Sequence, residues 1–449
     1  MKVQLAAKPT YLRLPDVDFL DLFQRIEQRY DSCFMLESLG EWTADSRHSV
    51  IGFAPEKILR GTKDGLVVDG QLIPSENPYH LLKEFIPEGM ISRNYCGGLV
   101  GYIGYDAMNF FEPSLALAEH PEFDSFQFGV YTDGLTHDSM TGETFYFYYN
   151  INRIEEIRTV LNDSTFKKHQ RPRVTAVGDS CTAERHAAMV LETREEILKG
   201  NTFQCQIGFR SDFEISGSPV AIYENLRDVN PSPHMFYVKL ADKVLLGASP
   251  ELAFRLRQGE IETFPLAGTT KRGSNPADDK LLARKLLNDP KEIAEHNMLV
   301  DLHRNDLGRV ARPGTVKVRR LMDVKRFSHV QHISSEVVGI IARNHDMFSG
   351  LASVFPAGTL SGAPKIESMK IIERIEKDPR GPYGGAVGHF GFNGDCTFAI
   401  PIRSLFISGS KGFIRASGGI VFDSTPEGEY AEIQAKLASM RKAIAPFLV

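Results

Sequence analysis

The sequence predicts an α+β protein, and the order of its predicted elements supports that class. Short strand-like runs separated by turns fill the first third, and helical and strand patterns are mixed after residue 182. Strands and helices do not follow the βαβ order of a doubly wound parallel fold. The 449 residues, 42% hydrophobic and 24% charged, suffice for two domains or for one large domain with a deep core.

Charge, hydropathy and cysteine content argue against several classes of protein. The formal net charge is -5, so no basic face is implied and no nucleic-acid partner is expected. Residues 1–19 lack a signal-peptide apolar stretch, and no run approaches the roughly 20 apolar residues of a membrane span. The five cysteines are scattered and form no CxxC pair. A disulfide framework or zinc site is therefore not expected, and a cytoplasmic location fits best.

Strand-like runs in the first third are bounded by turn residues. They occupy 49–55, 65–73 and 143–151, and the Asp-Gly pair inside the second run predicts a hairpin. The basic stretch 167–173 then breaks the pattern and is interpreted as a solvated linker. We therefore expect an N-terminal region over 1–165 and a catalytic region over 175–449.

Helices with clear end signals follow this linker. Residues 182–200 predict a helix with Thr182 as N-cap and Gly200 just beyond its end. Further elements are expected as strands around turns over 243–269, a helix over 275–287, a helix beginning at Asp289, a strand over 413–422 and a helix over 426–444.

The helix that begins at Asp289 carries two carboxylates on one face. Asp289 is the expected N-cap, and Glu292 and Glu295 lie three residues apart. Glu292 also fits a capping-box carboxylate, and the sequence alone does not decide between that role and a ligand role.

The last helix repeats this arrangement, with Thr425 before Pro426 at its start. Glu429, Glu432 and Lys436 fall at i, i+3 and i+7 and so share a face. One interpretation is an exposed Glu–Lys pair, which spacing alone favours. The other is that both helices present carboxylates to one hard cation, since Mg²⁺ takes oxygen ligands from one or two protein carboxylates and from substrate.

Glycine-rich turns and one arginine are further candidates for ligand contact. Segments 355–365, 380–395 and 416–424 can bring backbone N–H groups close to an anion, although each also fits a plain connection. Arg403 lies in the apolar run 399–407 and needs a carboxylate or carbonyl partner. A ligand carboxylate and a structural salt bridge are equally compatible with it.

Read together, these segments resemble the chorismate-utilising family, which includes anthranilate, aminodeoxychorismate, isochorismate and salicylate synthases. The matching stretches are 97–107 (GGLVGYIGYDA), 230–237 (NPSPHMFY), 247–251 (GASPE), 265–273 (PLAGTTKRG), 289–310, 327–337, 355–365 (FPAGTLSGAPK), 380–392 and 418–437. The resemblance implies an α+β fold of stacked antiparallel sheets flanked by helices, with the active site in a cleft.

The resemblance also implies a magnesium site and two catalytic residues. Glu295 and Glu432 are expected to bind Mg²⁺, with Glu292 and Glu429 close behind and acting through water. Glu251 matches the general acid that protonates the departing C4 hydroxyl of chorismate, which requires a raised pKa.

Other matched positions are expected to contact the substrate. His332 matches a histidine implicated in elimination of the enolpyruvyl side chain. The remaining substrate-binding candidates are Tyr383, Arg403 and Gly419 for the second carboxylate, Thr359 in the pocket wall and Lys436 beside the metal-side carboxylate.

Two positions indicate which reaction of the family to expect. Gln204 stands where isochorismate and salicylate synthases have a lysine that activates water. Ala267 stands where most aminodeoxychorismate synthases have a nucleophilic lysine. Both favour an anthranilate-forming enzyme that uses ammonia from a separate glutamine amidotransferase subunit, because no amidotransferase region is found in the chain. The alternatives are another ammonia-dependent chorismate enzyme and a non-catalytic regulatory relative.

Two segments resemble the family's tryptophan-binding motifs. One contains Glu37 and Ser38, and the other contains Pro233, His234 and Met235. L-tryptophan is therefore expected as an inhibitor, although apolar residues in both segments fit simple core packing.

Five positions depart from the family pattern, among them His234, which stands where the inhibitor-binding segment often has tyrosine. Ser417 replaces the first glycine of a turn, which puts the backbone contact there in question. Thr397 and Phe398 replace a common Asp-Thr pair, and His389 replaces a tyrosine.

Overall fold

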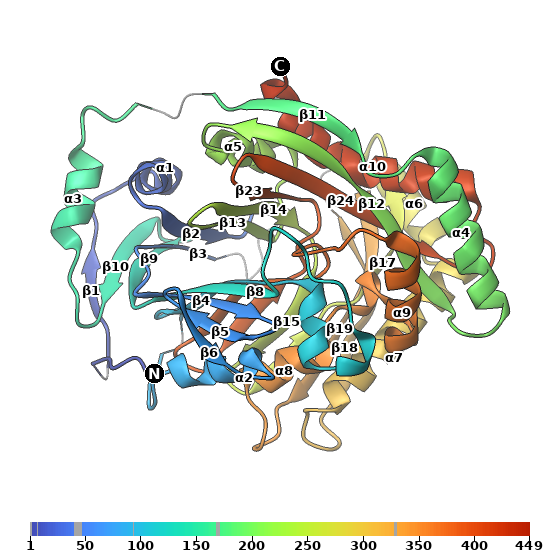
Figure 1. The fold of residues 1–449 in the computed structure, drawn as a ribbon, viewed down its shortest axis with the longest axis horizontal. Helices are drawn as coiled ribbons and strands as arrows, with labels where there is room; N and C mark the ends of the chain where they lie inside the picture. The colour runs from blue at the N-terminus through green and yellow to red at the C-terminus, as the bar shows by residue number, and fades with distance from the viewer. Residues whose placement is uncertain (1, 7, 40–46, 93, 168–170, 327–329) are drawn as a thin grey trace.

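Two large antiparallel sheets stack on one another, and helices lie outside them (Figure 1). The computed structural model describes residues 2–6, 8–39, 47–92, 94–167, 171–326 and 330–449. Part of the expected linker at 167–173 and the start of the matching stretch 327–337 lie outside these residues. Stacked antiparallel sheets flanked by helices confirm the predicted α+β class.

The first sheet has twelve strands within the described residues. In spatial order its strands are β1 (Thr10–Arg13), β10 (Glu143–Tyr148), β9 (Asp133–Asp138), β3 (His48–Phe53), β2 (Ser32–Glu37), β13 (His234–Leu240), β14 (Lys243–Ser249), β23 (Ser404–Ser408), β24 (Lys411–Ile420), β12 (Gln204–Ser216) and β11 (Arg173–Asp179), with β20 (Gly362–Ala363) also paired to β12. Strands from the N-terminal region therefore continue the sheet that the later strands form.

The second sheet also has twelve strands in the described part of the chain. Its order is β17 (Leu266–Lys271), β19 (Val330–Ile340), β16 (Glu260–Thr263), β15 (Leu252–Arg257), β22 (Cys396–Ala399), β21 (Ala386–Gly391), β7 (Gly98–Ile103), β8 (Phe126–Tyr131), β4 (Lys57–Thr62), β5 (Gly65–Val68) and β6 (Gln71–Pro74), with β18 (Lys317–Arg326) also on β19. The expected Asp-Gly hairpin joins β5 to β6.

Helices cover the outer faces and carry the end signals that the sequence predicted. Thr182, Asp289 and Thr425 each cap a helix by accepting backbone N–H bonds. The α-helices are α1 (Phe19–Arg29), α2 (Pro78–Leu81), α3 (Ile154–Asn162), α4 (Ala183–Leu198), α5 (Val220–Val229), α6 (Pro276–Leu286), α7 (Pro290–Gly308), α8 (Met347–Val354), α9 (Lys365–Glu376) and α10 (Pro426–Ile444). No described helix is long and apolar enough to cross a membrane.

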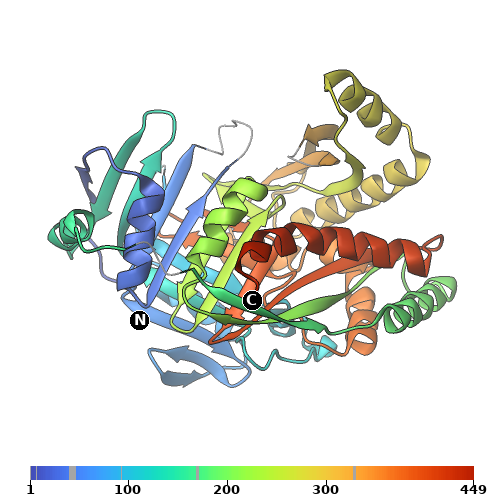
Figure 2. The same cartoon turned by 90° about the horizontal axis from the view of Figure 1, so that it is seen from above.

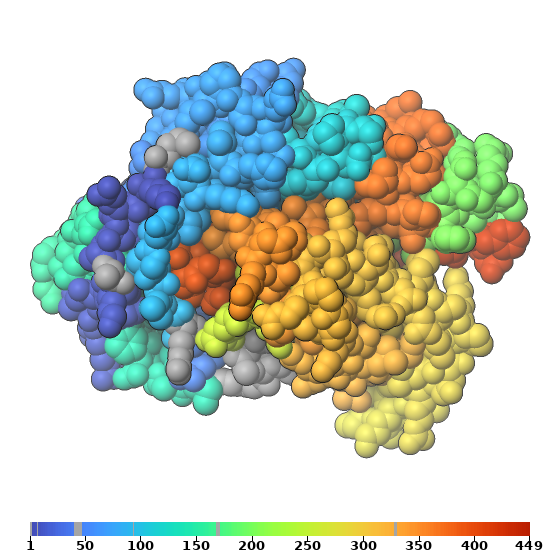
Figure 3. All heavy atoms as spheres, turned by 90° about the horizontal axis from the view of Figure 1, so that it is seen from below, coloured from blue at the N-terminus to red at the C-terminus, as the bar shows by residue number. Residues whose placement is uncertain are grey.

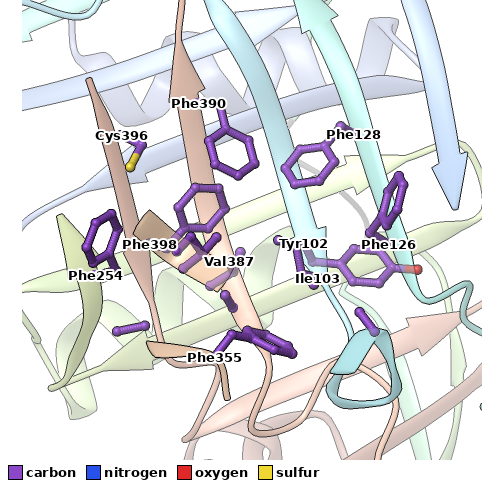
Figure 4. Packing of buried hydrophobic residues seen from close by; sticks show 14 of the residues in the cluster. Tyr102, Ile103, Phe126, Phe128, Phe254, Phe355, Val387, Phe390, Cys396 and Phe398 are labelled. Carbon is purple, nitrogen blue, oxygen red and sulfur yellow. The ribbon is translucent and has the colours of Figure 1, made fainter. Parts of the chain in front are cut away.

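Aromatic side chains fill the core beside the second sheet (Figure 4). The Phe390 ring lies 4.6 Å from Phe398 and 5.6 Å from Phe128, measured between centroids, and all three are fully buried. Phe348 of α8 stacks on Phe390 at 4.3 Å. Truncating one such ring to alanine costs about 3–5 kcal/mol, so this cluster stabilises β8, β21 and β22 of the second sheet.

One segment projects from the body of the molecule. In Figure 2 the helices α6 and α7, in dark yellow, extend away from the stacked sheets. Figure 3 shows the same segment as a protruding yellow lobe on the lower face. Helix α7 nevertheless contacts β17 and β19, and Glu292 in its first turn lies beside Gly268 of β17.

Candidate active site

Glu251 is buried between the two sheets, in the turn that links β14 to β15. It is 4% exposed, and its Oε1 accepts a hydrogen bond of 2.8 Å from the Thr359 hydroxyl. Burial raises the pKa of Glu251 to about 8, while the Thr359 bond, Arg403 and Lys436 oppose that rise. The carboxyl group is therefore mostly protonated at neutral pH, as a general acid requires.

Arg403 lies near Glu251 and precedes β23. Its backbone has a φ of 50°, a left-handed conformation that is uncommon for a residue with a side chain. Burial lowers the pKa of Arg403, and the Glu251 carboxylate opposes that effect. A partly buried guanidinium beside a mostly protonated acid is suited to a ligand carboxylate.

His332 on β19 faces the bulge at Gly268 in the neighbouring strand β17. Its Nδ1 lies 3.0 Å from the hydroxyl of Thr269 and 3.2 Å from the carbonyl of Gly268. Burial, with Arg403 and Lys436 nearby, lowers the pKa of His332 to about 3, so the ring is neutral. Because a carbonyl only accepts, the Gly268 contact favours the tautomer with the proton on Nδ1.

Ala267 and Gln204, the two residues expected to distinguish the reactions, lie on different sheets. Ala267 pairs with Ile333 across β17 and β19 and precedes the bulge at Gly268 beside His332. Gln204 begins β12, is 3% exposed, and donates from Nε2 to Oε1 of Glu295 over 2.9 Å. Gln204 therefore holds one of the expected magnesium ligands, a contact that the sequence did not predict.

The carboxylates of α7 and α10 face one another. Burial raises the pKa of both Glu292 and Glu295, and Glu432 on the other helix raises each of them further. Burial likewise raises the pKa of Glu429. The Oε2 atom of Glu292 lies 3.0 Å from where a Cβ on Gly268 would stand. The first turn of α7 thus lies against the bulge at Gly268 beside His332.

Glu432 and Lys436 form the pair that helical spacing predicted. Their N–O distance is 2.8 Å, with side chains 50% and 43% exposed. Lys436 also donates to the backbone carbonyl of Ser417 over 2.7 Å. Glu429 accepts from Ser424 over 2.6 Å through Oε1, whereas its buried Oε2 has no hydrogen-bond partner among the described residues. The pair is therefore tied to β24 through Ser417 and is not an isolated surface contact.

These carboxylates fit a hard divalent cation. A cation would give the buried Oε2 atom of Glu429 a partner, which it lacks among the described residues. A cation would also offset the repulsion between Glu292, Glu295 and Glu432. No group of three His, Cys, Asp or Glu side chains in the described ranges is close enough to hold a metal alone. Magnesium usually takes only one or two protein carboxylates and completes its shell with water and substrate oxygens.

Tyr383 and Gly419 lie beside Ser417 and Gln204, which contact the expected metal-side residues. The Tyr383 hydroxyl lies 2.9 Å from the Ser417 hydroxyl, two residues before Gly419 on β24. A Cβ on Gly419 would approach the Gln204 amide to 2.4 Å, so a side chain there would displace that residue. The expected catalytic, substrate and metal residues thus come together from both sheets, α7 and α10.

The segments expected to bind tryptophan lie next to each other. Strand β2, which ends at Glu37, pairs with β13, and Met235 is the partner of Glu37. The buried Glu37 carboxylate binds Arg227 at 2.7 Å and the Tyr223 hydroxyl at 2.7 Å. Ser38 follows the strand, and Pro233 precedes His234 at the start of β13.

Three of the departures from the family pattern lie away from the reacting groups. Phe398 is buried in the aromatic core, and Thr397 pairs with His389 and Arg255 in the second sheet. His389 is packed edge-on against Tyr95 at 5.2 Å. Only Ser417 lies within the site, where it also contacts Gln206, a residue that the sequence analysis did not single out.

The architecture and site define the class of protein. Residues 31–442 match the family of chorismate binding enzymes, and the chain belongs to that family. It is 59% identical over 450 residues to anthranilate synthase component 1 of Leptospira biflexa, covering 99% of this chain and 97% of that protein. It is 44% identical over 428 residues to anthranilate synthase component 1 of Methanothermobacter thermautotrophicus, covering 94% and 91%.

A solved structure agrees with this relationship. Anthranilate synthase component I from Streptococcus pneumoniae superimposes with a TM-score of 0.80 at 29% sequence identity. The superposition covers 90% of this chain and 94% of that chain.

Proposed function

We propose that the chain is the synthase component of anthranilate synthase, which converts chorismate and ammonia to anthranilate and pyruvate. The observation that carries the proposal is the buried Glu251, with a pKa of about 8, in one site with Arg403, His332 and the acidic faces of α7 and α10. The two relatives described above, at 59% and 44% identity, are named anthranilate synthase component 1.

Each protein group has a role in this reaction. Glu251 gives its proton to the C4 hydroxyl, which leaves as water while ammonia attacks C2. Neutral His332 is placed to accept a proton when pyruvate is eliminated and the ring becomes aromatic. Arg403 and Tyr383 hold the second carboxylate. Glu295 and Glu432 would hold Mg²⁺, with Glu292 and Glu429 behind them, and the bound ion would neutralise the ring carboxylate.

Neither Ala267 nor Gln204 carries a nucleophilic amine, and we therefore expect ammonia itself to add at C2. Ala267 cannot form a covalent adduct with the ring, so nitrogen must arrive as free ammonia. Gln204, whose amide binds Glu295, is not a base and cannot activate water in place of ammonia. The first intermediate is then aminodeoxyisochorismate, which loses pyruvate to give anthranilate.

Product analysis tests this assignment. Purified chain with chorismate, magnesium and ammonium is expected to release anthranilate and pyruvate in equal amounts, measured by mass spectrometry of the quenched reaction. Predominant aminodeoxychorismate, or accumulated aminodeoxyisochorismate, would show that another ammonia-dependent reaction of the family takes place.

The same assay identifies the nitrogen donor. We propose that a glutamine amidotransferase subunit supplies ammonia, so glutamine alone should give no anthranilate while ammonium does. Glutamine-dependent product from the homogeneous chain would contradict a separate subunit.

We also propose that L-tryptophan inhibits the enzyme by binding where β2 meets β13. His234 on β13 pairs with Ser249 on β14, and the Ser249 hydroxyl accepts from the Glu251 amide over 3.2 Å. A ligand that shifts the end of β13 therefore acts one strand away from the general acid.

Ser38→Ala is expected to weaken tryptophan inhibition by about tenfold or more, because a hydrogen bond to a charged ligand contributes roughly 1.5–3 kcal/mol. Ser32→Ala, at the other end of β2, is the matched control and should leave the inhibition constant unchanged. Calorimetric titration of tryptophan into the wild-type protein measures binding directly, and the absence of a binding isotherm would rule the site out.

A further inference from the structure

Ser417 lies at the centre of a chain of hydrogen bonds inside the site. It is 3% exposed, and its hydroxyl lies 2.9 Å from that of Tyr383 and 3.1 Å from Oε1 of Gln206. Its carbonyl accepts the Lys436 bond described above. One serine therefore connects β24 with β12, with α10 and with the loop before β21.

The direction of donation follows from the chemistry of each partner. The amide oxygen of Gln206 only accepts, so Ser417 donates to it, and the Ser417 oxygen then accepts the proton of Tyr383. A serine hydroxyl rotates, so Ser417 can donate to the Tyr383 oxygen instead whenever the phenol turns its own proton toward another acceptor.

The ring of Tyr383 is held without help from Ser417. The guanidinium carbons of Arg380 and Arg415 each lie 5.9 Å from the ring centroid. Both arginines are buried and bind Glu376, at 2.8 and 2.7 Å. Removal of the Ser417 hydroxyl therefore leaves the ring in place and takes away one hydrogen-bond partner of the phenol.

We infer that Ser417 is a positioning residue that supports Tyr383 in binding a carboxylate of the substrate, an inference that rests on the proposed function. When Tyr383 donates to the ligand carboxylate, Ser417 donates to the Tyr383 oxygen. The buried phenol oxygen stays satisfied, and a hydroxyl that accepts a hydrogen bond is a stronger donor. Ser417 acts through Tyr383 and does not need to touch the substrate.

A double-mutant cycle tests this role. Ser417→Ala should raise the KM for chorismate and its Kd by about three- to tenfold, the equivalent of one neutral hydrogen bond, with kcat changed less than about twofold. In a Tyr383→Phe background, which lacks the phenol hydroxyl, the same change should have little further effect on either constant. Ser211→Ala is the control, because this buried serine on β12 bonds Asp179 instead.

An equal rise in the Kd for chorismate in both backgrounds would overturn the inference, because Ser417 would then act independently of the phenol. An unchanged or lowered Kd in Ser417→Ala would also overturn it. Measuring the Kd by calorimetry keeps the cycle separate from the proposed function. Wild-type protein that binds chorismate but forms another product would refute the proposed reaction, while the coupling between Ser417 and Tyr383 would still be read from binding. Thermal unfolding of each variant verifies that it is folded.

Discussion

Glu251→Gln is expected to lower kcat by about 10²–10⁴-fold, the contribution that general acid catalysis typically makes. Glutamine keeps the size of the side chain and can still bind the Thr359 hydroxyl, but it has no proton to deliver to the C4 hydroxyl. Steady-state kinetics with chorismate, magnesium and ammonium measure the effect. An unchanged kcat with a raised KM would make Glu251 a binding residue instead.

The pH profile gives a second test of Glu251. Since its pKa is raised to about 8, the proton is present below that pH and is lost above it. The kcat/KM of the wild type should therefore fall as the pH rises through about 8, and the low residual activity of Glu251→Gln should lack that limb. Asp106→Asn is the matched control, because burial also raises the pKa of this acid, to about 6, outside the site.

Local signals in the sequence predicted much of the fold. Thr182, Asp289 and Thr425 are N-cap residues followed by helical patterns, and the Asp69-Gly70 pair marks the hairpin of β5 and β6. Such signals act between residues close in the sequence, so they can be recognised without knowing the fold. The order of strands in the two sheets is set by contacts between distant segments, and only the resemblance to known enzymes indicated the stacked arrangement.

Local patterns likewise could not establish the site. Glu295 and Glu432 are each on a helix whose spacing fits an exposed face, and only the meeting of α7 and α10 brings them together as candidate cation ligands. The raised pKa of Glu251 comes from burial between sheets, which no spacing encodes. The hydrogen bond from Gln204 to Glu295 could be identified only from the structure. The sequence does place Gln204 and Gln206 on one face of β12, because they are two residues apart in a strand.

Loss of either expected metal ligand should remove most of the activity. Glu295→Ala and Glu432→Ala are each expected to lower kcat/KM by at least about 100-fold, since removing even the partners of metal ligands costs 10–100-fold. Glu295→Ala also leaves the buried Gln204 amide without its acceptor, so its effect should be the larger. Glu427→Ala, an exposed carboxylate in the first turn of α10, is the control and should retain wild-type kinetics.

Binding measurements separate a metal role from a structural one. Magnesium should tighten chorismate binding to the wild type, because the ion would join the ring carboxylate to Glu295 and Glu432. That tightening should be absent in both variants, while their thermal unfolding in chelator should match the wild type apart from the effect of the lost Gln204 contact. Full activity of Glu432→Ala in excess chelator would contradict the metal assignment. Because burial, and then neighbouring carboxylates, raise the pKa of Glu292, Glu295 and Glu429, the wild type should also bind Mg²⁺ more weakly as the pH falls and protons compete with the ion.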